Sequence, residues 1–328
     1  MSSDSSRESL FVIRRLLLFA FSLLLFAPTL LFAQTPESES PAASRQQDVI
    51  YGRKFGTALT LDVFTPQEPN GLGLIQVVSG GWYSGPAGIN TGFVQPFLDR
   101  GSTVFAVVHG SQPKFTIPEI LEDMHRAVRF IRHNAAKYGI DPDRIGICGG
   151  SAGGHLSLMQ GTAGTEGDPK AADPVDRESS RVQAVACFFP PTDFLNYGEK
   201  GNVVLGENTI PGFHPPFDFR EYSQEKNRYL AVTDPDRQKE IGRAISPVTH
   251  ATSDDPPALI IHGDADKLVP IQQAELMVEA LKAKGVEAKL VVREGASHGW
   301  ATIGEDLQLF ADWFDKHLRH DDEAASEK

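Results

Sequence analysis

Short apolar runs rich in β-branched residues recur along most of the chain and alternate with stretches of helical periodicity. Runs this short and this continuously apolar are typical of strands buried on both faces of a parallel sheet. The alternation predicts an α/β fold with a mainly parallel, doubly wound sheet, helices on both faces and ligand sites at the carboxyl ends of the strands. The expected strands are residues 74–78, 103–108, 144–148, 182–189, 258–261 and 288–292.

The clearest helical pattern covers residues 117–138, where apolar side chains recur at three- and four-residue spacing. Gly139 follows this pattern as a stop signal. Further helices are expected over residues 271–284 and 305–318, and an N-terminal antiparallel hairpin over residues 48–54 and 59–64.

The first 33 residues have the layout of an export signal. Arg14 and Arg15 precede an apolar run over residues 16–33, which ends in small Ala33 before polar Gln34. We interpret residues 1–33 as a signal peptide that exports the protein to the periplasm or the extracellular space. The run is near the ~18-residue lower limit of a membrane span, so an uncleaved N-terminal anchor is the main alternative. An internal core helix is the other alternative.

The remaining chain is expected to form one large domain with irregular segments. Residues 34–47 are rich in Pro, Ser, Glu and Ala and predict a disordered linker. The domain then covers residues 48–320, and 321–328 form an acidic tail. Residues 196–243 break the strand and helix alternation and are expected to form a structureless, lid-like insertion. A plain surface excursion is the alternative.

Composition excludes several classes of protein. The 31 Lys and Arg residues against 43 Asp and Glu give a net charge of −12, so nucleic acid is not an expected partner. Cys148 and Cys187 are too few for a disulfide scaffold and are expected to be buried thiols on adjacent strands, where a disulfide would be strained. The ten histidines are scattered, so no metal site is expected.

A candidate nucleophile lies between a predicted strand and a predicted helix. Residues 149–153 read Gly-Gly-Ser-Ala-Gly, a G-x-S-x-G pattern that places Ser151 in the required strand-to-helix context. The flanking glycines allow the sharp turn that such a serine needs. A glycine-rich turn that merely packs a helix on a strand is the alternative.

A serine nucleophile needs a base and an orienting acid, which in this motif follow later strands in the order Asp, then His. Asp266 follows strand 258–261 and His298 follows strand 288–292, so both are expected at the same sheet edge as Ser151. Asp264 is an alternative acid, and His262 is expected to be a packed histidine. A calcium loop at Asp264 and Asp266 is not favoured, because no terminal Glu follows.

The reaction also needs donors for a developing oxyanion. The strand at residues 74–78 ends in Ser-Gly-Gly-Trp, and the N–H groups of Gly80 and Gly81, together with that of Ala152, are candidates for this oxyanion hole. An ordinary strand-to-loop turn is the alternative.

With these motifs in place, the chain resembles α/β-hydrolase-fold esterases of the acetyl esterase/lipase type. This group includes hormone-sensitive-lipase-like carboxylesterases and bacterial acetyl xylan and feruloyl esterases. The resemblance covers residues 48 to 318 and implies a serine carboxylesterase without a cofactor. It is carried by residues 59–64, 79–82, 138–144, 149–154, 246–247, 262–270 and 297–300, with Pro118 and Glu122-Asp123. Residues near the predicted site that we expect to contact substrate are Trp82, His109, His155 and Trp300.

The chain departs from the family pattern at two strand ends. Val78 and Ser79 stand where the family has His-Gly before its oxyanion glycines, so the loop loses the histidine that normally buttresses it. His109 and Gly110 stand where Tyr-Arg is frequent.

We therefore expect an exported hydrolase of short-acyl esters, with a small-molecule or polysaccharide ester such as acetylated or feruloylated polysaccharide as its partner. No membrane partner is expected unless the N-terminal segment stays uncleaved, and the sequence sets no oligomeric state. A serine peptidase of the prolyl-oligopeptidase type and a non-catalytic binding module on a hydrolase scaffold are the alternatives.

Overall fold

The computed structural model describes residues 43–210 and 212–319. The expected signal peptide, residues 34–42 of the expected linker and the expected acidic tail lie outside the described residues. No helix within the described ranges is long and apolar enough to cross a membrane.

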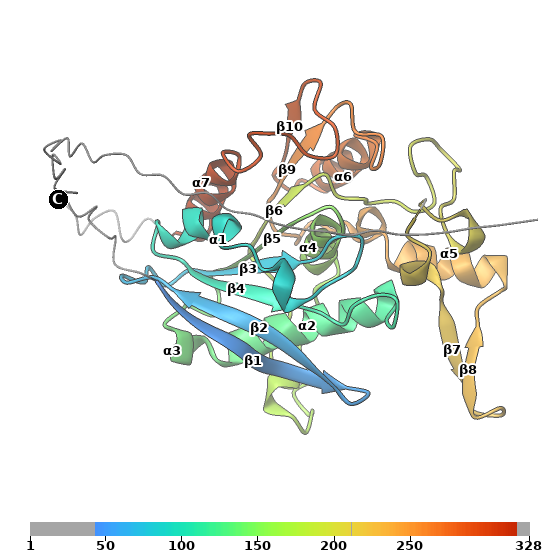
Figure 1. Cartoon of the computed structure of the whole chain (residues 1–328), viewed down its shortest axis with the longest axis horizontal. Helices are drawn as coiled ribbons and strands as arrows, with labels where there is room; N and C mark the ends of the chain where they lie inside the picture. Colours follow the sequence, from blue (N-terminus) through green and yellow to red (C-terminus); the bar gives the residue numbers. More distant parts are fainter. Residues whose placement is uncertain (1–42, 211, 320–328) are drawn as a thin grey trace, which may run out of the picture. The chain divides into compact units, whose positions relative to one another are not determined.

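The main sheet has eight strands in the order β1-β2-β4-β3-β5-β6-β9-β10. The pairs β1/β2 and β2/β4 are antiparallel and the remaining pairs are parallel, which confirms the predicted, mainly parallel sheet (Figure 1). The strands are β1 Ser44–Lys54, β2 Thr57–Thr65, β3 Gly73–Val78, β4 Thr103–Val108, β5 Ile145–Gly150, β6 Ala184–Phe188, β9 Ala258–Gly263 and β10 Ala288–Arg293.

The N-terminal hairpin forms as predicted, but it begins earlier. Phe55 and Gly56 both have positive φ, 46° and 75°, as a tight turn between two twisted strands requires. Residues 44–47, expected as linker, are the start of β1, because Ser44 pairs with Thr65 and Arg45 forms an ion pair of 2.6 Å with Asp62. Pairing with β2 orders a segment whose composition alone favours disorder.

Alternate residues along each central strand point to opposite faces, and each face is covered by helices (Figure 1). Ile75 and Val77 belong to the core beneath α2, α4 and α6, whereas Leu74 and Val78 belong to the core beneath α1 and α7. These helices are α1 Thr91–Leu98, α2 Ile117–His133, α4 Ala152–Thr162, α6 Gln272–Ala283 and α7 Leu307–Leu318.

The long pattern over residues 117–138 is two helices. A capping box of Thr116 and Glu119 begins α2, and Asn134, with φ −101° and ψ 16°, interrupts the helix before α3 (Ala135–Tyr138). Gly139 ends α3 in the left-handed conformation, φ 66°, as its position predicted.

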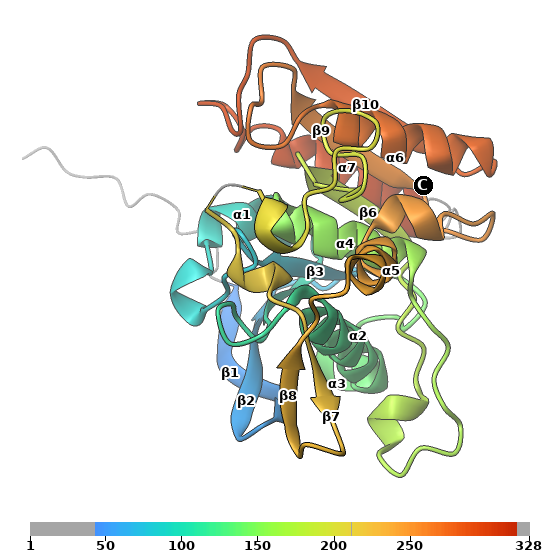
Figure 2. The same cartoon turned by 90° about the vertical axis from the view of Figure 1, so that its right-hand side faces the viewer.

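We expected the insertion at residues 196–243 to be structureless, and this prediction is wrong. It contains β7 (Arg220–Ser223), β8 (Arg228–Ala231) and most of α5 (Pro235–Ala244). The β7/β8 hairpin projects away from the main sheet in Figure 1, and Figure 2 views the molecule from the side on which this hairpin lies. Short runs of 3-10 helix are Pro86–Gly88, Pro174–Arg177, Gly206–Asn208, Pro215–Phe217 and Pro247–His250.

Candidate active site

Three loops at the carboxyl edge of the sheet bring the predicted triad together. Ser151 follows β5, Asp266 follows β9 and His298 follows β10. His298 Nε2 lies 3.0 Å from Ser151 Oγ, and His298 Nδ1 lies 2.7 Å from Asp266 Oδ2. Both distances are those of hydrogen bonds, so a proton can pass from the hydroxyl to an imidazole that a carboxylate orients.

The turn that carries Ser151 is sharp and closely packed. Ser151 has φ 54° and ψ −120°, a backbone conformation that residues other than glycine rarely adopt and that the surrounding structure must hold in place. A Cβ on Gly149 would lie 2.6 Å from the Gly153 carbonyl carbon, and a Cβ on Gly153 would lie 2.9 Å from the Val77 carbonyl oxygen. Both motif glycines are therefore required by backbone that passes within contact distance.

Asp266 is held as a carboxylate. Its Oδ1 accepts hydrogen bonds from the N–H groups of Leu268 and Val269, at 2.9 and 3.0 Å. Burial raises the pKa of this carboxyl, but hydrogen bonds from His262, His298 and Val269 outweigh burial and lower the pKa below its ordinary value. Asp266 is consequently ionised at neutral pH, as an acid that orients a histidine must be.

The two residues that competed with the triad have other contacts. Asp264 is exposed and accepts a hydrogen bond of 2.6 Å from the Gly295 N–H. His262 is fully buried, as expected for a packed histidine, with Nε2 at 2.8 Å from the Val269 carbonyl oxygen and 3.3 Å from Asp266 Oδ2. The geometry therefore favours Asp266 over Asp264 as the acid.

Phe189 is a site residue that sequence reasoning missed. Its ring lies against the His298 ring, with centroids 4.3 Å apart, and its φ of 35° is unusual for a large side chain. Phe189 directly follows β6, so its place at the carboxyl end of a central strand was the signal that could have found it. The ring limits the freedom of the proposed base.

The oxyanion loop differs from expectation at one donor. The Gly80 N–H donates to the Tyr83 carbonyl at 3.0 Å, and the Tyr83 N–H donates back to the Gly80 carbonyl at 2.9 Å. Gly80 is therefore already bonded, because positive φ at Gly81 and Trp82 closes this tight turn. Within the described ranges, the N–H groups of Gly81 and Ala152 have no hydrogen-bond acceptor and stay available to an oxyanion.

Trp82 and His155, expected to contact substrate, lie in the core instead. Trp82 is 2% exposed and donates its indole N–H to His155 Nδ1 at 3.1 Å, and His155 Nε2 contacts the Ile245 carbonyl at 2.7 Å. Phe194 and Phe217 complete the cluster. These side chains link the oxyanion loop to α4 and the insertion, so their role is packing.

Of the other two expected substrate residues, His109 is buried and Trp300 is half-buried. His109 Nε2 lies 2.9 Å from Ser79 Oγ, and the ring does not reach the surface. The expectation that His109 contacts substrate is therefore wrong as well. Trp300 packs on Phe189 and donates its indole N–H to Asp306 at 2.8 Å. Trp300 thus stays a prediction as a substrate contact.

The insertion reaches the oxyanion loop through Phe213. A Cβ on Gly81 would lie 2.2 Å from the Phe213 ring, so the ring rests directly on this glycine. Tyr83, two residues beyond Gly81 in the same loop, is 62% exposed.

Across the described residues, no group of three His, Cys, Asp or Glu side chains is arranged to hold a metal ion.

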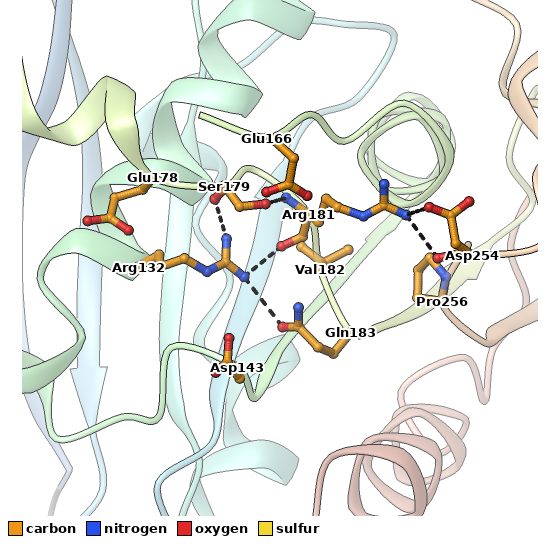
Figure 3. A pocket seen from close by; sticks show the side chains of 10 residues that line it. All are labelled: Arg132, Asp143, Glu166, Glu178, Ser179, Arg181, Val182, Gln183, Asp254 and Pro256. Carbon is orange, nitrogen blue, oxygen red and sulfur yellow. Dashed lines mark hydrogen bonds and ion pairs between the residues drawn. The ribbon is translucent and has the colours of Figure 1, made fainter. Parts of the chain in front are cut away.

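A separate pocket lies at the other edge of the sheet (Figure 3). Its lining residues include Asp143, Gln183 and Pro256, which precede β5, β6 and β9. The Arg132 guanidinium in this pocket donates to the carbonyl groups of Ser179 and Arg181, so it holds the segment before β6 in place. This pocket is therefore not part of the site around Ser151.

The fold and the three loops define an α/β-hydrolase with a Ser-His-Asp arrangement. The family model described as BD-FAE matches residues 61–281, more than half of the chain, and a dienelactone hydrolase family model matches residues 241–328. The chain belongs to the BD-FAE family of α/β-hydrolase carboxylesterases.

Relatives and solved structures agree with this membership. A probable carboxylic ester hydrolase, LipM of Mycobacterium tuberculosis, is 30% identical over 72% of this chain and 51% of its own length. The chain spans about half the length of the first curated relatives it matches. A truncated carbohydrate esterase from gut microbiota is 25% identical with a TM-score of 0.68, covering 86% of this chain and 98% of the other. A propionate-bound esterase of Thermogutta terrifontis is 25% identical with a TM-score of 0.63, covering 85% and 95%.

Proposed function

We propose that this protein is a serine carboxylic-ester hydrolase that acts through an acyl-enzyme. The single observation that carries the proposal is the contact of His298 with both Ser151 Oγ and Asp266 Oδ2, at 3.0 and 2.7 Å. Membership of an esterase family supports the same reaction.

The geometry suggests how each group acts. Ser151 Oγ attacks the ester carbonyl carbon while His298 Nε2 takes the hydroxyl proton. The N–H groups of Gly81 and Ala152 stabilise the negative oxygen of the tetrahedral intermediate. His298 then protonates the leaving alcohol, and a water molecule that His298 deprotonates releases the acid from Ser151. Asp266 keeps the imidazole in the tautomer that this sequence of steps needs.

The substrate class within this proposal is a short-acyl ester of a carbohydrate, such as an acetylated or feruloylated polysaccharide. Similarity to a solved carbohydrate esterase supports it. The proposal includes export, supported by the charged and apolar pattern of residues 1–33. N-terminal sequencing of the mature protein tests the export step, and Gln34 is the expected first residue.

The experiment compares the wild-type protein with Ser151→Ala on acetyl, butyryl, octanoyl and feruloyl esters of p-nitrophenol. We expect turnover on the acetyl ester to exceed that on the octanoyl ester, and Ser151→Ala to lose ~10⁵-fold or more in kcat, since the nucleophile is gone. A fluorophosphonate probe should label the wild-type protein and not the variant. Wild-type turnover by folded Ser151→Ala, checked by circular dichroism, would sink the assignment.

A further inference from the structure

Ser79 is the residue through which β3 enters the oxyanion loop, and its side chain contacts a buried histidine. His109 Nε2 lies 2.9 Å from Ser79 Oγ. His109 follows β4, the neighbouring parallel strand, and is 3% exposed. Loss of the Ser79 hydroxyl is costly, because the buried His109 ring would lose its hydrogen bond without gaining water.

The direction of this hydrogen bond follows from the other ring nitrogen. His109 Nδ1 lies 2.9 Å from the Gly110 carbonyl oxygen, which can only accept, so Nδ1 carries the proton. Nε2 is then the acceptor, and the Ser79 hydroxyl donates to it. Burial, aided by the charge of Lys54 and opposed by the Gly110 hydrogen bond, lowers the pKa of His109 to about 4. The ring is neutral at physiological pH.

The main chain at Gly110, which directly follows His109, is anchored from two other elements. The Gly110 N–H donates to Asp123 Oδ2 of α2 at 2.8 Å, and Asp123 Oδ1 pairs with Lys54 of β1 at 2.6 Å. Both charged side chains are largely buried. A Cβ on residue 110 would lie 2.7 Å from Asp123 Oδ2, so the anchor requires glycine there. His109 is thus a fixed reference point and not a mobile side chain.

The far end of the oxyanion loop is tied to the same residue. Ser84 Oγ donates to the Val78 carbonyl at 2.6 Å and accepts from the His109 N–H at 3.2 Å. His109 therefore holds the loop at both ends, through Ser79 by its ring and through Ser84 by its main chain. The Gly80 and Gly81 turn lies between these two ties.

We propose that His109 is a positioning residue that, through Ser79, holds the Gly81 N–H where the oxyanion forms. The resembling esterases place a histidine at the position of Val78, inside the loop, whereas here an imidazole reaches the loop from the adjacent strand. The inference rests on the proposed function. It explains how the oxyanion loop can stay supported although Val78 and Ser79 replace the His-Gly of the family pattern, because His109 supplies the support.

The test measures kcat and KM on p-nitrophenyl acetate for Ser79→Ala, His109→Ala, His109→Gln and the double alanine variant. We expect each single alanine variant to lower kcat roughly 10- to 100-fold with KM within about threefold, because the loop acts mainly on the transition state. The double variant should be no slower than the slower single variant, since each single substitution already breaks the same hydrogen bond between Ser79 and His109. His109→Gln should regain part of kcat, because its amide oxygen can accept from Ser79.

A matched control breaks a similar pair elsewhere. His125 Nδ1 lies 3.0 Å from Ser180 Oγ, beside Gln160 in the last turn of α4, at the opposite end of this helix from Ser151. Ser180→Ala should leave kcat within about twofold of the wild-type value while lowering the melting temperature.

The outcomes separate this inference from the proposed function. Wild-type kcat in Ser79→Ala, additive losses in the double variant, or an equal loss in Ser180→Ala would each overturn the positioning role while leaving the triad intact. If Ser151→Ala retains turnover, the proposed function fails instead. Ser79 is half-buried and its truncation removes one oxygen, so Ser79→Ala supplies a folded variant if His109→Ala does not fold.

Discussion

At the scale of single residues, two aspartates of the same loop differ in what they can do because their surroundings differ. Asp264 and Asp266 lie two positions apart, yet one is exposed beside Gly295 and the other is buried beside His298. Only the buried carboxylate, held by two N–H groups of its own loop, can fix an imidazole tautomer.

Asp266→Asn should lower kcat on p-nitrophenyl acetate by ~10⁴-fold, the loss typical of triads in which an amide favours the wrong tautomer. Asp264→Asn is the matched control and should stay within about threefold of wild type, because the Asn oxygen can still accept from the Gly295 N–H. Steady-state kinetics check both variants. A near-normal rate for Asp266→Asn, with a large loss for Asp264→Asn, would transfer the role to Asp264.

At the scale of elements, the site depends on how closely β3 and α4 approach each other. A Cβ on Gly153, in the first turn of α4, would lie 2.9 Å from the Val77 carbonyl and 3.4 Å from the Ser79 carbonyl. The same close approach that permits the strand-to-helix turn therefore sets where the oxyanion loop begins.

Gly153→Ala should lower both stability and kcat, because the added methyl group pushes the end of β3 away from α4. We expect a loss of about 1–3 kcal/mol in the free energy of unfolding, typical of overpacking. Gly304→Ala is the control, since nothing lies within 4 Å of its Cβ position. Urea denaturation measures the change in stability, and steady-state kinetics measure the change in kcat. Wild-type stability and wild-type kcat in Gly153→Ala would show that the end of β3 can shift to accept the methyl group, against this prediction.

At the scale of the whole molecule, two buried histidines, His109 and His155, and the half-buried His125 make stability depend on pH. His109, His125 and His155 each have a pKa lowered to about 4, mainly by burial. Near pH 5 the unfolded chain protonates these residues, whose ordinary value is 6.5, while the folded protein keeps them neutral. The unfolded state then binds more protons, so stability falls as the pH drops from 6.5 toward 4.

Between pH 7.5 and 5, the free energy of unfolding should fall by roughly 2 kcal/mol for each of these histidines, and urea titrations at the two values measure the change. The lowered pKa of Asp266 acts in the same direction only below its ordinary value of 3.8, outside this window. His125→Gln should flatten the dependence. Equal stability at both pH values would contradict the neutral state of these three rings in the folded protein.

Much of the fold and the candidate triad could be predicted because their signals are local. Five of the six apolar runs correspond to central strands and the sixth to β10 at the edge of the sheet, and Ser151, Asp266 and His298 each follow one of the six. The insertion was harder, because hairpin β7/β8 is largely exposed and lacks an apolar face that would mark it in sequence. Residues 44–47 were also missed, because their polar side chains form a strand only through pairing with β2.

The sequence by itself determined the succession of strands and the loops that carry Ser151, Asp266 and His298, since parallel strands must present their carboxyl ends at one edge. Only the tertiary structure decided which neighbouring groups are free to act. Gly80 is bonded to Tyr83, Trp82 and His155 are buried, and His109 reaches Ser79 from another strand. Such contacts join residues far apart in the chain, and their burial and hydrogen bonding depend on everything packed around them.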